Sequence, residues 1–266
     1  WLVQSQSDVF IAGRLFDPHA LGLYAEALFL SQIFMAKFVP PLNEVAFPAY
    51  SRIKDDPAAM RRGFLKTVRL LMLVSAPFYC GLTVVAAPLV ETLFGPKWLG
   101  MAPYVQHISL ALMLMTVQIL FAPVNNALGK PSVTMFVSLG GAIIFPTAFL
   151  IGSQWGLIGM AWAWLVAAPL LLLYTVRLSA RLIGLSLWDI VRAMLPGLAP
   201  ALMMAIGVEL AAELIVPFHW AAPIRLGLLV GLGVALYGAL LWTFEREVIA
   251  EGIQIVLRRE PAADSA

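Results

Sequence analysis

The sequence predicts an all-α integral membrane protein, a polytopic helix bundle of about eight transmembrane helices of which the first is truncated. Two observations carry this prediction. Hydrophobic residues make up 61% of the 266 residues and charged residues only 12%, and the mean hydropathy is +0.90, whereas soluble domains are about half apolar and about a quarter charged. The apolar residues also form long runs, and runs of about 20 residues cross a bilayer as helices, while membrane strands need only about 10.

The apolar runs define the predicted spans. Prolines inside them are compatible with membrane helices, because neighbouring helices can satisfy the freed carbonyl groups. The pair Pro40–Pro41 predicts a bend in the second span. In order, the predicted spans run from before Trp1 to Phe16, from Leu21 to Tyr50, from Phe64 to Phe94, from Ala102 to Leu128, from Ser132 to Ile151, from Leu157 to Arg181, from Ile190 to Val216 and from Ile224 to Phe244.

The loop charges predict the orientation. Of the 17 Lys and Arg residues, Lys37 falls within a span, and Arg14, Lys97 and Arg225 fall in one set of alternate loops. All the others fall in the opposite loops, at the span ends that flank those loops, or in the tail, and such an excess of positive charge marks the cytoplasmic side. Residues 1–244 are thus a predicted transmembrane unit with a cytoplasmic C-terminus. Residues 245–266 form a predicted cytoplasmic tail, either an amphipathic helix on the inner leaflet or a solvated segment.

Several classes of chemistry are absent from the sequence. One cysteine excludes an internal disulfide and a cysteine-based metal site. The three histidines are scattered, and neither H-E-x-x-H nor the phosphate-binding G-x-x-x-x-G-K-[ST] occurs. The loops are too short for a soluble catalytic domain, and no basic, aromatic stretch suggests nucleic-acid binding. The chain begins within an apolar segment and has no initiator Met, so we expect it to be the C-terminal part of a longer protein.

Five stretches, read in order, resemble the Wzx-type polysaccharide flippases of the MATE/MurJ-like exporter superfamily. They cover most of residues 1–180, and their order and spacing carry the resemblance more than any single piece. They are SDVFIAGRLFDPHALGLYAEA, FPAYSRIKDD, LFGPKW, NALGKP and WGLIGMAWAW. Members of this family have two similar helical lobes, so the resemblance implies that this chain is the C-terminal lobe and that an N-terminal lobe lies upstream.

The resemblance also implies a function. Such a protein flips a lipid-linked oligosaccharide of the polyprenyl-pyrophosphate type across the bacterial inner membrane, for O-antigen, exopolysaccharide or capsule synthesis. It works by alternating access between two lobes, with no cofactor beyond a Na⁺ or H⁺ gradient, and it is a transporter rather than an enzyme. The alternatives are a cation-coupled multidrug exporter of the same fold and a membrane glycosyltransferase or polymerase. The second is weak, because such enzymes need a sizeable outer loop.

Asp8 is the first candidate functional residue. It lies about eight residues, or ~12 Å, from the outer end of its predicted helix, near the middle of the bilayer. An acid there costs at least ~2.5 kcal/mol on insertion scales, so it should face a partner or a water-filled cavity. Two hypotheses stand at near-even odds: Asp8 couples transport to an ion gradient, or it pairs structurally with a basic residue of a neighbouring helix. The fifth predicted span has no carboxylate to complete an ion site.

Glu26, Lys37 and Glu44 follow the second predicted span at spacings of eleven and seven residues. These spacings are close to whole helical turns, so the three side chains share one face if the helix is continuous. Lys37 is a cation predicted deep in the membrane, where it needs an anion. A lipid pyrophosphate would supply one, and an ion pair with Asp8, Glu26 or Glu44 is the slightly favoured alternative.

The fourth predicted span repeats the spacing with His107, Gln118 and Asn125, and Asn126 is adjacent. Amides can hydrogen-bond sugar hydroxyls, but buried amides more often bridge neighbouring membrane helices. We therefore regard Gln118, Asn125 and Asn126 as candidate sugar contacts with helix bridging as the stronger alternative. His107 is predicted to lie near the outer surface.

Three arginines near the cytoplasmic side complete the candidates. Arg52, Arg61 and Arg62 are expected to follow the positive-inside rule and to bind anionic lipid head groups. A second role at the same place would be to attract the pyrophosphate to a cytoplasmic mouth of the transport path.

Overall fold

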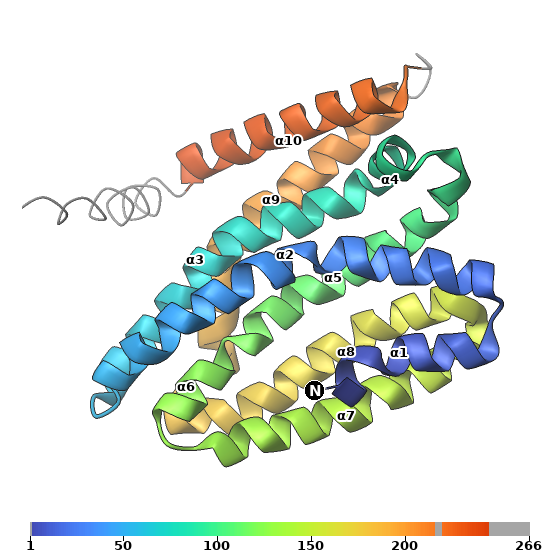
Figure 1. Cartoon of the computed structure of the whole chain (residues 1–266). Helices are drawn as coiled ribbons and strands as arrows, with labels where there is room; N and C mark the ends of the chain where they lie inside the picture. Colours follow the sequence, from blue (N-terminus) through green and yellow to red (C-terminus); the bar gives the residue numbers. More distant parts are fainter. Residues whose placement is uncertain (1, 216–219, 245–266) are drawn as a thin grey trace, which may run out of the picture.

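The structure is a computed structural model that describes residues 2–215 and 220–244. The described part of the chain is helical throughout and holds no strand. The helices are α1 (Leu2–Leu15), α2 (Pro18–Arg52), α3 (Pro57–Val84), α4 (Ala86–Phe94), η1 (Pro96–Met101), α5 (Ala102–Ile119), α6 (Phe121–Ala127), α7 (Pro131–Gly152), η2 (Ser153–Trp155), α8 (Gly156–Ser179), η3 (Ala180–Leu182), α9 (Leu187–Ile215) and α10 (Ala222–Phe244) (Figure 1).

The predicted all-α polytopic fold is confirmed. Six stretches are long and apolar enough to cross a membrane, and one of these, Pro131–Leu182, has 52 residues and contains both α7 and α8. The third predicted span consists of α3 and α4, and the fourth consists of α5 and α6. The predicted tail helix at 245–266 lies outside the described residues, so that prediction stays open.

α2 is the longest helix and runs through Pro40, Pro41 and Pro48. It changes direction near its middle (Figure 1), as the proline pair predicts. Asp17 caps its first turn, because the carboxylate accepts hydrogen bonds from the backbone N–H groups of Ala20 and His19, each at 3.0 Å. These donors, Ala20 first, hold the pKa of Asp17 below its usual value.

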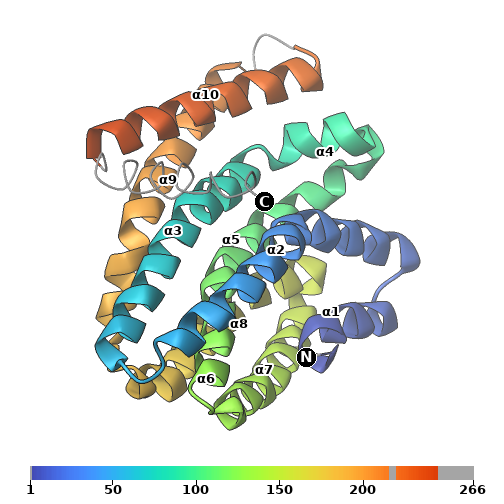
Figure 2. The ribbon, with the colours of Figure 1, turned by 60° about the vertical axis from the view of Figure 1, so that its left-hand side comes forward.

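The helices form two groups joined by α2 and α5. In one group α7 packs against α8 and against α1, and in the other α9 packs against α3 and α10. α5 contacts both α8 and α3, and α2 lies against α5 (Figure 2). A salt bridge of 2.6 Å between Arg225 Nη2 and Glu91 Oε2 connects α10 to α4.

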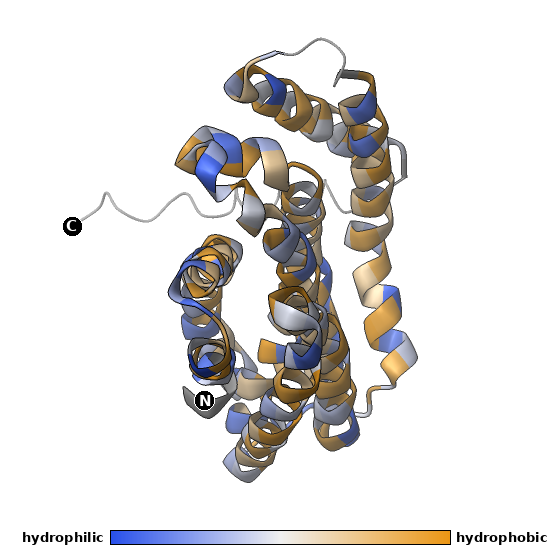
Figure 3. Cartoon of the chain, turned by 90° about the vertical axis from the view of Figure 1, so that its right-hand side faces the viewer, coloured by the Kyte–Doolittle hydropathy of each residue, from blue (hydrophilic) through white to orange (hydrophobic). Residues whose placement is uncertain are grey.

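Hydrophobic residues predominate along the helices (Figure 3), and many large apolar side chains are exposed. Side chains such as Phe29, Ile143 and Ile206 are more than 60% exposed, which would be unfavourable in water but is suited to lipid. Together with the six apolar stretches, these exposed side chains define a multi-pass membrane protein.

The loops lie at two ends of the bundle, left and right in Figure 1. The left end holds the connections after α2, α6 and α8, with most of the basic residues, and we call it the basic end. Gly129, in the connection from α6 to α7, has φ +67°. This left-handed conformation favours glycine, and it explains why the NALGKP stretch has a glycine there.

The contact between α3 and α9 leaves no room for a side chain at Gly197. A Cβ atom there would lie 2.5 Å from the carbonyl carbon of Met72. We expect Gly197→Leu to destabilise the protein by about 1–3 kcal/mol or more, because overpacking forces the backbone apart. The measurement is the unfolding temperature in detergent. Gly227→Leu is the matched control, since a Cβ at Gly227 has no neighbour within 4 Å, and an equal loss in both variants would contradict the prediction.

Candidate functional site

Asp8 is the buried acid of the bundle. Its side chain is 1% exposed and lies where α1 meets α2 and α8. The Tyr24 hydroxyl on α2 donates a hydrogen bond to Asp8 Oδ2 at 3.3 Å. Trp164 Nε1 on α8 donates to the same Tyr24 oxygen at 3.1 Å. A chain of hydrogen bonds therefore runs from Trp164 through Tyr24 to Asp8.

The direction of these hydrogen bonds is fixed by the donors. An indole N–H can only donate, so the Tyr24 oxygen accepts from Trp164 and directs its own proton to Asp8. The backbone N–H of Val9 donates to the other carboxylate oxygen at 2.8 Å. Within residues 2–215 and 220–244, no Lys or Arg forms an ion pair with Asp8. The partner is a neutral hydroxyl, which neither hypothesis from the sequence had named.

A cavity of about 430 Å³ lies between α2, α5 and α8. Most of its wall is apolar and comes from side chains such as Met35, Val39 and Met115. Two amides of α2, Gln32 and Asn43, provide its polar groups together with the edge of Trp164. The Oδ1 atom of Asn43 is buried and has no hydrogen-bond partner, so it is free to accept a hydrogen bond from water or from a hydroxyl group.

Trp164 belongs to both features. Its ring lines the cavity and its N–H donates to Tyr24, and the ring is fixed from behind by Phe145 and Phe149. Any occupant of the cavity that moves this ring therefore also alters the hydrogen bond that orients Tyr24 toward Asp8. The cavity and the buried acid are thus one connected site.

The polar stripe of α2 lies beside the cavity rather than in its wall. α2 is helical through Glu26, Lys37 and Glu44, and Glu26 is half-buried while the other two are exposed. At roughly 100° per residue, the stripe lies about a third of a turn from the face that Gln32 and Asn43 give to the cavity. Lys37 makes no ion pair within the described residues, so the pairs considered for it are not formed.

The amides at the end of α5 and in α6 contact neighbouring helices. Gln118 Nε2 donates to Thr175 Oγ1 at 3.3 Å and Asn125 Nδ2 donates to Ser179 Oγ at 3.0 Å, which joins this segment to α8. Asn126 is exposed and accepts from the Thr134 hydroxyl of α7 at 3.4 Å. These contacts are the helix bridges considered from the sequence.

Gln118 and Asn125 also border a second hollow. This hollow has a volume of about 230 Å³, and Ile119 lines both it and the larger cavity. The Oδ1 atom of Asn125 is buried there without a partner. Gln118 and Asn125 can therefore bridge helices and still offer one acceptor to a ligand.

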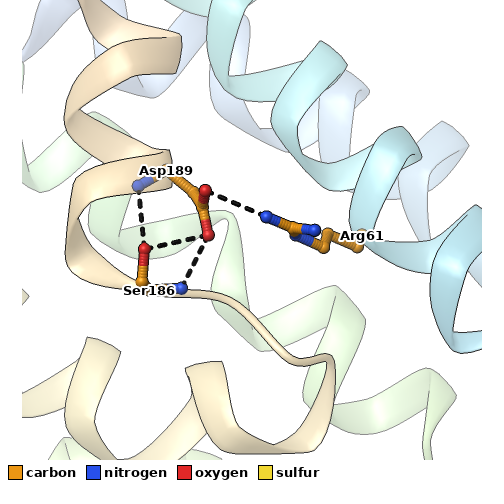
Figure 4. A network of polar contacts seen from close by, with 3 residues as sticks. All are labelled: Arg61, Ser186 and Asp189. Atoms are coloured by element: carbon orange, nitrogen blue, oxygen red, sulfur yellow. Dashed lines mark hydrogen bonds and ion pairs between the residues drawn. The ribbon is translucent and has the colours of Figure 1, made fainter.

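The three arginines of the basic end have different surroundings. Arg61 Nη2 on α3 pairs with Asp189 Oδ1 on α9 at 2.9 Å (Figure 4). Asp189 in turn accepts hydrogen bonds of 2.9 Å from the backbone N–H and the hydroxyl of Ser186. Arg62 lines a hollow between α3 and α9, and Arg52 is exposed in the last turn of α2.

Sequence reasoning missed Tyr24, Trp164, Gln32 and Asn43. A signal existed for two of them, since Gln32 and Asn43 have the same eleven-residue spacing as Glu26 and Lys37. Tyr24 and Trp164 gave no such signal, because an aromatic residue in an apolar run usually packs in a core or faces lipid. No group of three or more His, Cys, Asp or Glu residues that could hold a metal ion is found in the described parts of the chain.

The helical bundle defines a class of membrane protein with a known fold. A solved structure, the lipid II flippase MurJ in an inward closed conformation, superimposes with a TM-score of 0.74 over 93% of this chain and 52% of that chain, at 14% identity. The chain therefore has the MurJ-like fold.

The sequence comparisons identify the nearer relatives. Residues 1–103 match a family described as "Polysaccharide biosynthesis protein". The teichuronic acid biosynthesis protein TuaB of Bacillus subtilis is 29% identical over 86% of this chain and 48% of its own length. The lipopolysaccharide biosynthesis protein WzxC of Escherichia coli is 26% identical over 77% of this chain and 43% of its own. The succinoglycan biosynthesis transport protein ExoT of Rhizobium meliloti is 24% identical over 98% and 53%.

These matches confirm the resemblance to Wzx-type polysaccharide exporters. The chain spans about half the length of the curated relatives it matches.

Proposed function

We propose that this chain is the C-terminal lobe of a flippase that moves a lipid-linked oligosaccharide across the bacterial cytoplasmic membrane for surface polysaccharide synthesis. The observation that carries the proposal is the connected site, in which the cavity wall residue Trp164 also holds Tyr24 toward the buried Asp8. The fold and the names of the relatives support the same function. The protein is accordingly a transporter rather than an enzyme, and an N-terminal lobe completes the transport path.

The physical task is to carry a polar head group past hydrocarbon. Each sugar hydroxyl without a hydrogen-bond partner in an apolar medium costs several kcal/mol. A path between two lobes removes this cost by offering acceptors such as Asn43 Oδ1, which is buried without a partner. The lobes then rock so that the path opens to each leaflet in turn, while the lipid tail stays in the bilayer.

The candidate residues take separate roles in this proposal. Lys37, exposed on α2 beside the cavity, holds the pyrophosphate by charge-assisted hydrogen bonds. Glu26 and Glu44 share its face and lie beside the proposed path of the head group, although neither pairs with Lys37 among the described residues. Gln118 and Asn125 border the second hollow and contact sugar hydroxyls there, together with Asn126, which accepts a hydrogen bond from the lining residue Thr134.

The basic end is the cytoplasmic end in this proposal. The basic loops there follow the positive-inside rule, so the lobe lies in the inner membrane with its C-terminus in the cytoplasm. Arg52 then lies at the cytoplasmic mouth, whereas Arg61 is occupied by Asp189.

Asp8 couples transport to an ion gradient, and its surroundings favour H⁺ over Na⁺. A metal cation such as Na⁺ needs several oxygen ligands, as hard cations do. The described partners of the carboxylate are an N–H and an O–H donor, and the Tyr24 oxygen already accepts from Trp164. A proton needs only the carboxylate itself.

The test is a transport measurement on the full-length protein. Liposomes that contain the protein and a fluorescent lipid-linked oligosaccharide should move the label between leaflets, and expression in a flippase-deficient bacterium should restore surface polysaccharide. Protein that is present in the membrane but gives neither result with its native glycan precursor would refute the proposal.

One observation favours a second candidate, a multidrug exporter of the same fold. The cavity wall is mainly apolar and includes Met35, Met115 and Trp164, and methionine and aromatic side chains suit varied lipophilic ligands. Such an exporter would raise resistance to lipophilic cations in a susceptible strain, whereas the flippase would leave resistance unchanged.

A further inference from the structure

A hollow of about 580 Å³ lies between α3 and α9 at the basic end, away from the proposed transport site. It shares no lining residue with the cavity between α2, α5 and α8. Its charged residues come from one face of each helix, since positions 62, 66 and 69 of α3 and positions 189 and 192 of α9 are three or four residues apart. The lining residues are Arg62, Leu65, Lys66, Arg69, Asp189, Arg192, Ala193 and Pro196.

Basic residues predominate among the charged residues that line this hollow. Four of its residues are basic, and Asp189 is its one acid. Asp189 is already held by Arg61 at 2.9 Å and by the backbone N–H and hydroxyl of Ser186 (Figure 4). The acid is therefore compensated by a cation outside the hollow, and Arg62 and Arg192, both exposed, form no ion pair among the described residues.

One exposed face of α9 continues from the hollow into the apolar part of the helix. Leu195, Leu202 and Ile206 follow Arg192 at spacings of three, seven and four residues and are 44%, 46% and 62% exposed. Trp188 precedes Arg192 by one turn and is 57% exposed, and the Arg192 guanidinium lies 5.3 Å from its ring centroid. Tryptophan prefers the head-group level of a membrane, and leucine and isoleucine prefer the acyl chains.

We propose that this hollow binds the phosphate of an anionic phospholipid, whose acyl chains lie along Leu195, Leu202 and Ile206 of α9. Arg62 and Arg192 supply the charge-assisted hydrogen bonds that a phosphate needs. The continuous apolar face below Arg192 favours a lipid over a free phosphate, because a soluble ion would make no use of it. The proposal does not depend on the transport function.

The experiment counts lipids bound to the full-length protein by native mass spectrometry, with phosphatidylglycerol and phosphatidylcholine as probes. Phosphatidylglycerol should bind more tightly than phosphatidylcholine. Arg192→Gln and Arg62→Gln should each weaken phosphatidylglycerol binding about fivefold, since a basic residue near an anionic surface contributes about 1 kcal/mol. The double variant should lose about thirtyfold if the two contributions add. Phosphatidylcholine binding should not change.

Two controls separate this site from its alternatives. Lys54→Gln removes an exposed cation of the same end that does not line the hollow, and it should leave binding unchanged. Arg192→Lys keeps the charge and should retain most of the affinity, which guards against a general loss of folding. Equal losses in Lys54→Gln and Arg192→Gln would reduce the effect to diffuse attraction and overturn the proposal. Displacement of the lipid by millimolar inorganic phosphate would assign the hollow to a soluble anion and overturn it as well.

Discussion

Replacing Lys37 by alanine is expected to abolish glycan export while the protein remains in the membrane. Lys37 is exposed on α2, beside the cavity between α2, α5 and α8, and it has no ion-pair partner among the described residues. A lysine at membrane depth costs about 2.5–3.5 kcal/mol on insertion scales, so it is expected to face a hydrated path or an anion. If a lipid pyrophosphate is that anion, the loss of a charged hydrogen bond of about 1.5–3 kcal/mol reduces substrate binding about tenfold to a hundredfold.

The measurement is surface polysaccharide in a flippase-deficient bacterium that expresses the full-length variant. Lys37→Arg should keep part of the activity, because it retains the charge with a different geometry. Lys54→Ala is the matched control, since it removes an exposed lysine at the basic end. Normal export by Lys37→Ala would show that Lys37 does not anchor the pyrophosphate.

The variant Glu44→Gln distinguishes two possible roles of Glu44, as a competitor for Lys37 or as a direct contact of the substrate. Glu44 is exposed on α2, seven residues or about two helical turns after Lys37. If Glu44 competes with the pyrophosphate for Lys37, its neutral variant should bind the lipid-linked substrate more tightly and not less. Weaker binding would instead make Glu44 a direct substrate contact.

The helices of this fold could be predicted because each span carries its own signal. A run of apolar residues such as that of α10 needs no tertiary information to be recognised, since the bilayer sets its length. The breaks within spans could not be predicted as well. The break between α3 and α4 at Val85 follows Pro77 and precedes Pro88, and whether a proline bends or ends a membrane helix depends on the neighbouring helices that satisfy the freed groups.

The site was only partly predictable, for a related reason. Asp8 was recognisable because a charged residue in an apolar run is costly wherever it lies. Its partner Tyr24 was not recognisable, because the contact depends on how α1 packs beside α2, and Trp164 is 140 residues further along the chain. Long-range packing decides which aromatic residue meets an acid, and no local pattern records it.

Replacing Asp8 by asparagine is expected to remove the response of export to the ion gradient without unfolding the protein. Asparagine has nearly the same shape, and its Oδ1 atom can still accept the Tyr24 hydrogen bond that Asp8 Oδ2 accepts at 3.3 Å. It cannot gain or lose a proton, however. The contact with Tyr24 would therefore survive this change and a coupling role would not, although the amide NH2 group cannot accept the Val9 N–H that Asp8 Oδ1 accepts at 2.8 Å.

The measurement is transport in liposomes with and without an imposed proton gradient, together with the unfolding temperature. The protein with Asp8 in place should transport faster when the proton gradient is imposed. If the gradient contributes more than 1.4 kcal/mol to transport, the increase should be at least about tenfold. Asp8→Asn should transport at the slow rate in both conditions. If Asp8→Asn still responds to the gradient, Asp8 serves only to join α1 to α2.

The variant Tyr24→Phe tests the hydrogen-bonded link from Trp164 to Asp8 while it leaves Asp8, the proposed proton carrier, in place. The variant leaves Asp8 Oδ2 and the Trp164 N–H without their shared partner in a buried site, at a cost of about 1–3 kcal/mol for each unsatisfied group. Asp8 can still take a proton, so the gradient should still be sensed, but cavity occupancy no longer reaches the acid through Trp164. We therefore expect Tyr24→Phe to conduct protons without export, whereas Asp8→Asn should conduct no protons and export at the slow rate that ignores the gradient. A Tyr24→Phe protein with normal export would break the proposed connection.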